Sequence, residues 1–507
     1  MNIKKAKEEI RDTIEAYLLK NPRGEYVIPA MRQRPVLLMG PPGIGKTQIM
    51  EQIAMECGIG LVAYTITHHT RQSAIGLPFI QERNYGGNVR HVTEYTMSEI
   101  VASVYDRMEE TGLSEGILFI DEVNCVSETL APAMLQFLQY KTFGNHRIPD
   151  GWIIVSAGNP PEYNKSVREF DMATLDRVKR MDVEPDFQVW KEYAKQADVH
   201  PAVISYLTAR PRYFYQVETT VDGKQFATPR GWEDLSGFLK VREQLGKTMD
   251  RDSVAQYIQH PRISRDFANY LELYHKYQEQ YQAAEVLKGH RDPALMEKAA
   301  RAPFDEKLSI ISLLLAELET AFRSWGRKED QLEIIMDVLK ELREQLNSPE
   351  GEAGEGPVML ETQIRHLDEI REKKKKSGLL SRERDYMYRD AEEKLNRFLQ
   401  TVRSEGLRMP SPLFDRIRQL FGYEKDEFEA FSAEVQEKLE YAFDFMEGTF
   451  GDSQEMVIFI TELNTGPHAV RFLQENECER YYQYNQRLLF EDRAGELKRR
   501  LEQLEEL

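Results

Sequence analysis

One segment near the N-terminus restricts the possible folds more than any other. The apolar run VLLM at 36–39 leads into a glycine-rich octet, and a helical pattern follows from Gln48. The octet matches G-x-x-x-x-G-K-[ST] in the strand–turn–helix context that this motif requires. Such a turn aims backbone N–H groups and the positive end of a helix at phosphate oxygens. The residues predicted to bind the phosphates are Gly40, Pro41, Pro42, Gly43, Ile44, Gly45, Lys46, Thr47 and Gln48.

Further apolar runs predict the sheet that carries this site. They occur at 60–66, 117–120, 152–157 and 180–185, with helical stretches between them. Strands alternating with helices indicate a parallel sheet covered on both faces, so we expect an α/β fold. After residue 186 the apolar spacing becomes helical, and no further strand is predicted.

The length of 507 residues allows two to four domains. We expect a lead-in helix at 1–30, an α/β nucleotide-binding domain at 31–186 and a small helical lid domain at 187–290. A mostly helical C-terminal region at 300–507 would be divided by a charged linker near 348–357. In this region the spacing predicts one helix over 308–318 and a second over 328–346.

Composition excludes several other classes of protein. There are 67 Lys plus Arg against 85 Asp plus Glu, a formal charge of −18, which argues against a nucleic-acid binder. Three widely spaced cysteines form neither a disulfide framework nor a zinc-ligand pattern. With no run of 18 apolar residues, we expect no membrane span and a cytoplasmic location.

Polar residues follow two of the predicted strands. Asp121 and Glu122 come directly after the run at 117–120, and Asn159 follows the run at 152–157. Next to a bound triphosphate, Asp121 and Thr47 would hold Mg²⁺, while Glu122 would activate the attacking water. Lys46 would place its charge on the terminal phosphates. Asn159 would hydrogen-bond the terminal phosphate, although an asparagine before proline is also a common turn residue.

Five ordered motifs carry a resemblance to a known family. They are Gly40 to Thr47, Asp121-Glu122-Val123-Asn124, Ala157-Gly158-Asn159-Pro160, Leu175-Asp176-Arg177 and Thr228-Pro229-Arg230. Together they resemble the AAA+ ATPases, and within these the MoxR-like family, over residues 30–245. The resemblance implies a P-loop core with a helical lid, MgATP hydrolysis and a homo-oligomeric ring, usually of six subunits. It also implies a client protein complex that is remodelled or matured, including by metal loading.

The resemblance also implies roles for single residues. Asn159 would be the phosphate sensor of the sheet, and Arg230 the lid arginine that touches the nucleotide. Arg177 lies where the family carries the arginine that a neighbouring subunit inserts. The family usually has phenylalanine after that arginine, whereas this chain has Val178, and Arg180 is a second candidate for the role.

Two segments would be insertions relative to the family's core. Residues 77–95 and 143–152 would each form a hairpin, the first around Gly86-Gly87. These hairpins would either contact a client protein or be plain surface loops.

The leading function is a remodelling ATPase whose partner, as the family implies, is a separate protein with a von Willebrand factor A domain. The alternatives are an AAA+ nucleic-acid motor and a nucleotide-gated scaffold that scarcely hydrolyses ATP.

Overall fold

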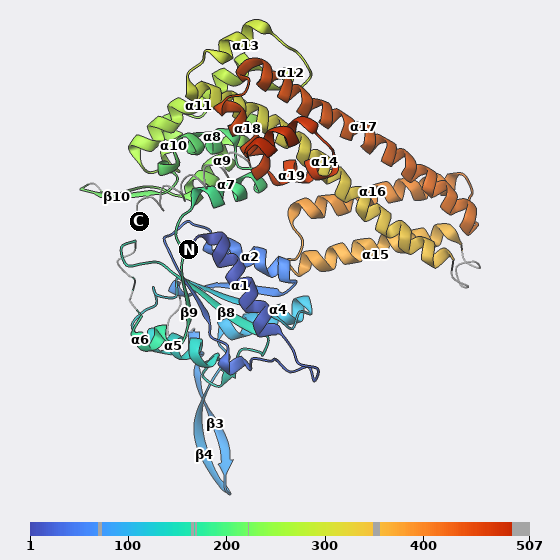
Figure 1. Ribbon diagram of the computed structural model, residues 1–507. Coiled ribbons are helices and arrows are strands. Elements are labelled where there is room, and N and C mark those ends of the chain that lie inside the picture. Colours follow the sequence, from blue (N-terminus) through green and yellow to red (C-terminus); the bar gives the residue numbers. More distant parts are fainter. Residues whose placement is uncertain (69–73, 164–166, 168–169, 222, 348–354, 489–507) are drawn as a thin grey trace, which may run out of the picture. The chain divides into compact units, whose positions relative to one another are not determined.

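The computed structural model describes residues 1–68, 74–163, 167, 170–221, 223–347 and 355–488 (Figure 1). The chain divides into two compact units. Unit 1 comprises Met1–Val189, Thr228–Arg230 and Glu369–Asp385, and unit 2 comprises the remainder. In the described part of the chain, no helix is both long enough and apolar enough to cross a membrane.

A five-stranded parallel sheet forms the centre of unit 1, which confirms the predicted α/β fold. The strand order is β2-β5-β8-β1-β9. Register pairs such as Val36 with Val155 and Val36 with Lys179 place the first strand between the last two. The strands are β1 (Val36–Met39), β2 (Gly60–Thr65), β5 (Gly116–Asp121), β8 (Trp152–Gly158) and β9 (Lys179–Asp182).

The central strands are apolar because both faces of the sheet are covered. Every residue of β1 and β8 is buried, and so is every residue of β5 except Asp121. Helix α2 packs against β2 and β5, α4 packs against β2, and α1 packs on α2. The helices of this unit are α1 (Ile3–Leu18), α2 (Lys46–Cys57), α4 (Glu99–Thr111), α5 (Ala131–Tyr140) and the short α6 (Met172–Leu175).

Both predicted hairpins are present. Strands β3 (Pro78–Tyr85) and β4 (Asn88–Tyr95) pair antiparallel around Gly86-Gly87, whose φ angles are 60° and 89°. These left-handed values match a two-residue hairpin turn. The hairpin extends away from the sheet in Figure 1, and every residue of β3 is exposed. The second hairpin is shorter, with β6 (Thr142–Phe143) paired to β7 (His146–Arg147).

Unit 2 begins with a helical region that contains a hairpin the sequence did not predict. Strands β10 (Gln216–Thr220) and β11 (Gly223–Ala227) pair antiparallel, so the expectation of no strands after residue 186 was wrong. Two five-residue strands whose residues are mostly exposed or only partly buried carry too weak an apolar alternation to be predicted from the sequence. The helices that lie wholly or mostly in this region are α7 (Phe187–Gln196), α8 (Pro201–Ala209), α9 (Pro229–Gln244), α10 (Arg251–Ala255), α11 (Pro261–Tyr281), α12 (Ala283–Val286) and α13 (Pro293–Ala300); the first residues of α7 and α9 belong to unit 1.

The C-terminal part of unit 2 is helical, as predicted, but two expected helices are one. Helix α14 (Phe304–Leu346) runs without a break for 43 residues through Gly326. An interior glycine costs about 1 kcal/mol relative to alanine. Burial of the neighbouring Trp325, which is 2% exposed and packs against Phe472, offsets that cost.

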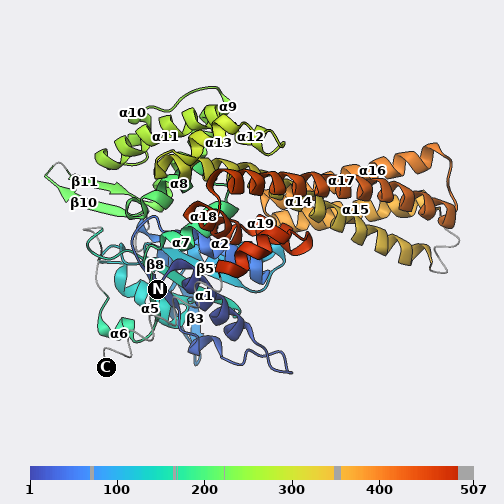
Figure 2. The ribbon, with the colours of Figure 1, turned by 45° about the horizontal axis from the view of Figure 1, so that its top comes forward.

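The remaining helices are α15 (Gly356–Lys376), α16 (Arg382–Ser404), α17 (Pro410–Phe450), α18 (Gln454–Thr465) and α19 (Pro467–Glu475). Leucine, isoleucine, valine and phenylalanine side chains from α14 to α17 share one apolar core, and Figure 2 shows these helices running alongside one another. Most of the predicted linker, at 348–354, lies outside the described residues.

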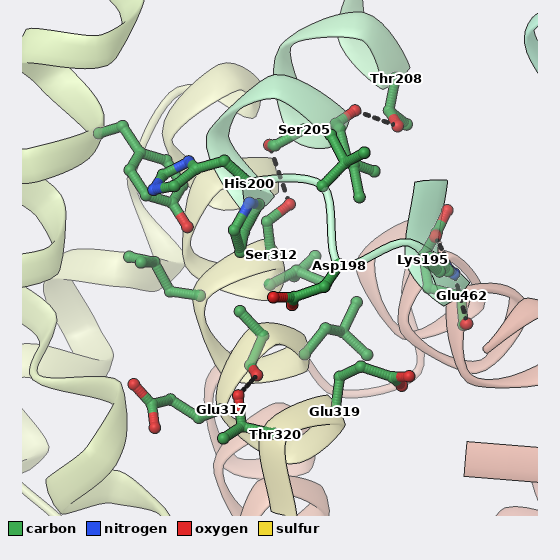
Figure 3. A pocket seen from close by; sticks show the side chains of 18 of the residues that line it. Lys195, Asp198, His200, Ser205, Thr208, Ser312, Glu317, Glu319, Thr320 and Glu462 are labelled. Carbon is green, nitrogen blue, oxygen red and sulfur yellow. Dashed lines mark hydrogen bonds and ion pairs between the residues drawn. The ribbon is translucent and has the colours of Figure 1, made fainter. Parts of the chain in front are cut away.

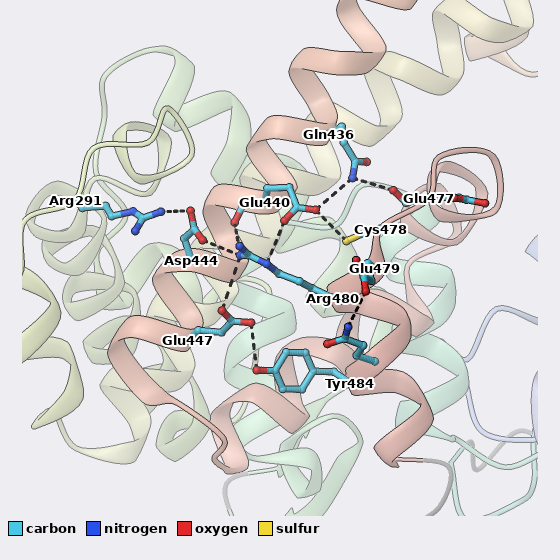
Figure 4. A network of polar contacts seen from close by, with 11 residues as sticks. Arg291, Gln436, Glu440, Asp444, Glu447, Glu477, Cys478, Glu479, Arg480 and Tyr484 are labelled. Atoms are coloured by element: carbon cyan, nitrogen blue, oxygen red, sulfur yellow. Dashed lines mark hydrogen bonds and ion pairs between the residues drawn. The ribbon is translucent and has the colours of Figure 1, made fainter.

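An arginine network anchors the helical segment 479–488 to α17. Arg480 contacts Asp444 at 2.7 Å, Glu440 at 3.4 Å and Glu447 at 3.9 Å, three acids on one face of α17 (Figure 4). Arg291 pairs with Asp444 from the other side. Burial raises the pKa of the Cys478 thiol to about 11, so this sulfur stays protonated and donates to Glu440.

Unit 2 also encloses a cavity of about 410 Å³ between α8, α14 and α18 (Figure 3). Its three Lys and Arg side chains are held in ion pairs, Lys195 with Glu462 and both Lys240 and Arg323 with Asp198. Glu319 lies on α14, and its Oε1 is buried without a hydrogen-bond partner among the described residues. Burial raises the pKa of Glu319 to about 7, although the positive charges of Lys195 and Arg323 oppose the shift.

Because of this carboxyl group, we expect the stability of the parent relative to Glu319→Gln to depend on pH. Because folding raises the pKa of Glu319, the folded chain holds the proton more tightly than the unfolded chain. The contribution of Glu319 to the free energy of unfolding is therefore full below pH 4.5 and is lost as pH rises through 7. At pH 8 the free energy of unfolding of Glu319→Gln, measured by urea denaturation, should therefore exceed that of the parent by on the order of 2 kcal/mol. At pH 4.5 the two chains should differ little. Glu317→Gln, at an exposed carboxylate on the same helix, is the matched control. Equal stability of Glu319→Gln and the parent at pH 8 would contradict the assignment.

Candidate nucleotide site

The glycine-rich octet forms a concave turn between β1 and α2. Gly43 and Gly45 have φ angles of 79° and 92°, and Ile44 between them does not have a positive φ. Alternation of this kind turns successive N–H groups inward into an anion-binding concavity. Gly40 is required for a different reason, since a Cβ there would lie 2.6 Å from the Val183 carbonyl oxygen. The sequence thus provides a phosphate cradle at the start of a helix of 12 residues.

Lys46 lies in the middle of this cradle. Its Nζ donates to the carbonyl oxygens of Gly40 and Pro41, at 2.8 and 2.9 Å, and to Asn159 Oδ1 at 2.9 Å. The side chain is buried, and this burial lowers its pKa to about 8. The nearby charge of Arg230 acts in the same direction, while Asp121 opposes it. At pH 7 the ammonium group is therefore still mostly charged and can balance phosphate oxygens.

Thr47 and Asp121 come together as the sequence predicts for a magnesium site. The Thr47 hydroxyl donates to Asp121 Oδ2 at 3.0 Å, joining the first turn of α2 to the end of β5. Mg²⁺ commonly takes one or two protein oxygens and completes its shell with water and substrate phosphates. No cluster of three or more His, Cys, Asp or Glu suited to a metal occurs in the described ranges. One hydroxyl and one carboxylate oxygen are the kind of donors that a protein contributes to Mg²⁺.

Glu122 has a backbone conformation that is unusual for its residue type. Its φ is 56°, and its N–H donates to Asp121 Oδ1 at 2.9 Å. A turn follows, in which the Cys125 N–H donates to the Glu122 carbonyl oxygen at 2.8 Å. A non-glycine residue in the left-handed region costs on the order of 1 kcal/mol, and such strain concentrates at functional sites. The turn places this carboxylate beside Asp121 at the carboxyl edge of the sheet.

Asn159 and Arg230 also reach the cradle. Asn159 follows β8, and its side chain accepts the hydrogen bond from Lys46. Arg230 belongs to unit 1 and lies in the first turn of α9, where its N–H donates to the Gly43 carbonyl oxygen at 3.2 Å. Residues separated by almost 200 positions in sequence thus meet around one phosphate-sized cradle.

The comparisons with known proteins agree with this geometry. Residues 35–178 match the model of the AAA domain, dynein-related subfamily. Residues 35–178 therefore form an AAA domain. That match ends at Val178, so it covers the glycine-rich turn and four strands of the sheet, but not β9, the lid or the C-terminal helices. No curated protein matches the chain.

Solved structures of Thermotoga maritima RuvB are also similar to this chain. One, titled a Holliday junction branch migration motor, is 18% identical and covers 51% of this chain and 69% of its own, with a TM-score of 0.29. A mutant of the same protein is 17% identical with the same coverage and TM-score.

The two candidate trans arginines of the AAA+ domain differ in their surroundings. Arg180 lies on β9 and is held by Asp182, with its Nε and Nη2 donating to one carboxylate oxygen at 3.0 and 2.8 Å. Arg177 lies in the turn after α6, is exposed, and forms no ion pair with any residue that the structure describes. The structure does not bring either arginine to the cradle of its own AAA+ domain, and the trans role stays a prediction.

One buried residue of this site, Asn124, belongs to the motif at 121–124 but received no role from the sequence. Asn124 is 2% exposed and hydrogen-bonds the backbone of Asn159 in both directions. The sequence contained a signal for it, since Asn124 is a polar residue two positions after Glu122 in an otherwise apolar stretch. No role followed from that signal, because the partner atoms belong to the backbone of another strand.

Proposed function

We propose that this chain binds MgATP at the cradle and hydrolyses it to ADP and phosphate. The observation that carries the proposal is the convergence of Lys46, the pair Thr47–Asp121 and Asn159 at one edge of the sheet. A phosphate cradle alone would serve many binding proteins. An acid pair beside a lysine and an amide supplies what in-line displacement of a terminal phosphate requires.

Each side chain has a distinct task in this reaction. Lys46 exchanges its three oxygen partners for phosphate oxygens and balances their charge. Glu122 orients a water molecule and accepts its proton as the oxygen attacks phosphorus. Asn159 donates its amide N–H to the terminal phosphate or to the water. Thr47 and Asp121 would hold a Mg²⁺ ion that arrives with the nucleotide, and the ion would neutralise charge on the phosphate oxygens.

We further propose a MoxR-like assembly, a homo-oligomeric ring that remodels a client protein complex. The exposed position of Arg177 supports this proposal, because an arginine without an ion pair in the described chain is available to a neighbouring subunit's phosphate. The β3–β4 hairpin supports client contact, since Ile80 and Val89 are 75% and 65% exposed. A separate partner with a von Willebrand factor A domain and a role in metal loading belong to the same proposal.

The competing functions lead to different measurements. A nucleic-acid motor is disfavoured by the charge of −18 and would reveal itself through salt-dependent DNA affinity. A nucleotide-gated scaffold would bind ATP with no phosphate release that depends on Glu122.

The test of the proposed function begins with steady-state phosphate release in Mg²⁺ and ATP. The parent chain should turn over, and Lys46→Ala should lose at least tenfold in ATP affinity because the cradle loses its only buried ammonium among the described residues. Lys141→Ala removes another buried lysine, one that contacts Gln33 and the Trp152 carbonyl oxygen away from the cradle, and is the control for stability. ATP binding by Lys46→Ala that matches the parent would refute the site.

A further inference from the structure

We infer that Asn124 is a positioning residue, one that holds the water-activating Glu122 and the phosphate-contacting Asn159 at a fixed separation. The inference rests on the proposed hydrolysis and adds a residue to it. Asn124 does not reach the cradle itself. Its effect would pass through the backbone of Asn159 and through the turn that carries Glu122.

The first observation is the pair of hydrogen bonds between Asn124 and Asn159. Asn124 Nδ2 donates to the Asn159 carbonyl oxygen at 2.8 Å, and the Asn159 N–H donates to Asn124 Oδ1 at 3.3 Å. A side-chain amide that donates and accepts in this way copies the pairing of a backbone peptide. The register of β5 with β8 runs to Ile120 and Ser156, and the Val123 N–H bonds the Ala157 carbonyl oxygen beyond it. Asn124 thus continues the pairing past the end of both strands.

The second observation is that the same residue lies inside the Glu122 turn. The bond from the Cys125 N–H to the Glu122 carbonyl oxygen closes a turn of four residues, and Asn124 is the third of them. Glu122 occupies its strained conformation at the start of that turn. Fixing Asn124 against Asn159 therefore also fixes the backbone from which the Glu122 carboxylate projects.

The third observation is the close packing of Gly158 against this amide. A Cβ at Gly158 would lie 2.7 Å from Asn124 Oδ1 and 2.9 Å from its Cγ. Both distances are shorter than side-chain contacts allow, and Asn124 is buried in a closely packed interior, so a side chain at Gly158 would have to displace its amide. The absence of a side chain at Gly158 is thus what lets Asn124 reach the Asn159 backbone.

Misplacing a reacting group by about 1 Å can lower a rate by about 10²-fold. We therefore expect Asn124→Ala to lower kcat by on the order of 10²-fold, while the ATP dissociation constant changes by less than about threefold. Gly158→Ala should lower kcat similarly, because its methyl group displaces Asn124. In the double variant the two losses should not multiply, since both remove the same contact.

Ser156→Ala is the matched control for a purely structural effect. Ser156 is buried on β8 three residues before Asn159, and its hydroxyl donates to the Val36 carbonyl oxygen at 3.0 Å. Its loss should lower the melting temperature with kcat unchanged. The inference is overturned when Asn124→Ala retains kcat within twofold of an active parent, or when the losses of Asn124→Ala and Gly158→Ala multiply. A parent that releases no phosphate overturns the proposed function, and the inference with it.

Discussion

Glu122→Gln is expected to stop phosphate release while ATP remains bound. Glutamine keeps the size and the hydrogen-bonding reach of the side chain, but it cannot accept the proton of the attacking water. Loss of general-base catalysis costs about 10²- to 10⁴-fold in rate. The cradle residues Lys46 and Thr47 are untouched, so ATP affinity should stay within a few-fold of the parent. Phosphate release and nucleotide binding by calorimetry, measured on the same preparation, separate the two effects.

The neighbouring Asp121 provides the contrast for this variant. Asp121→Asn removes the charge that faces the Thr47 hydroxyl and should weaken Mg²⁺-dependent binding as well as turnover. Hydrolysis by Glu122→Gln at the parent rate would show that another group activates the water. The Glu122→Gln chain with ATP would also retain clients that dissociate after hydrolysis, so what co-purifies with it identifies the partner.

Arg177→Ala is expected to produce the second large loss. An arginine inserted from a neighbouring subunit is worth about 10³- to 10⁵-fold in rate in comparable phosphate-transferring enzymes. Arg177 is exposed and Arg180 is held by Asp182, so the loss should occur at the first and not at the second. Arg180→Ala is the matched control, three residues away and of the same charge. Steady-state turnover of the two variants decides between the arginines.

Mixing subunits tests whether Arg177 acts on a neighbour. Arg177→Ala subunits keep their cradle, and Lys46→Ala subunits keep their arginine. A mixture should therefore contain interfaces with both parts intact and should regain part of the activity. If Arg177→Ala hydrolyses ATP at the parent rate, or if the mixture regains nothing, catalysis through this arginine across subunits is wrong.

The parts of the fold that the sequence predicts are those governed by short-range patterns. The strands begin and end within a few residues of the apolar runs, because burial on both faces leaves β1 and β8 apolar except for Ser156, whose hydroxyl is hydrogen-bonded to the Val36 carbonyl oxygen. The proximity of Thr47 and Asp121 also follows from the sequence, since parallel strands bring their carboxyl ends to one edge of a sheet.

Other features depend on contacts that no local pattern records. The continuity of α14 through Gly326 requires the packing of Trp325 against residues more than 100 positions away. The sequence offers both Arg177 and Arg180 for the trans role, and the ion pair of Arg180 with Asp182 becomes apparent only once β9 is formed. The role of Asn124 could not be predicted for the same reason. Its partners are backbone atoms of Asn159, and a sequence motif does not record which backbone atoms a side chain contacts.

The left-handed backbone at Glu122 has a consequence for how this chain would respond to selection. Glycine adopts that conformation without steric cost, so exchanging the acid for glycine would relieve the turn while deleting the proposed base. Glycine at this position would therefore raise thermal stability and lower turnover. A screen that rewarded only survival at high temperature would be free to enrich chains that no longer cleave the nucleotide.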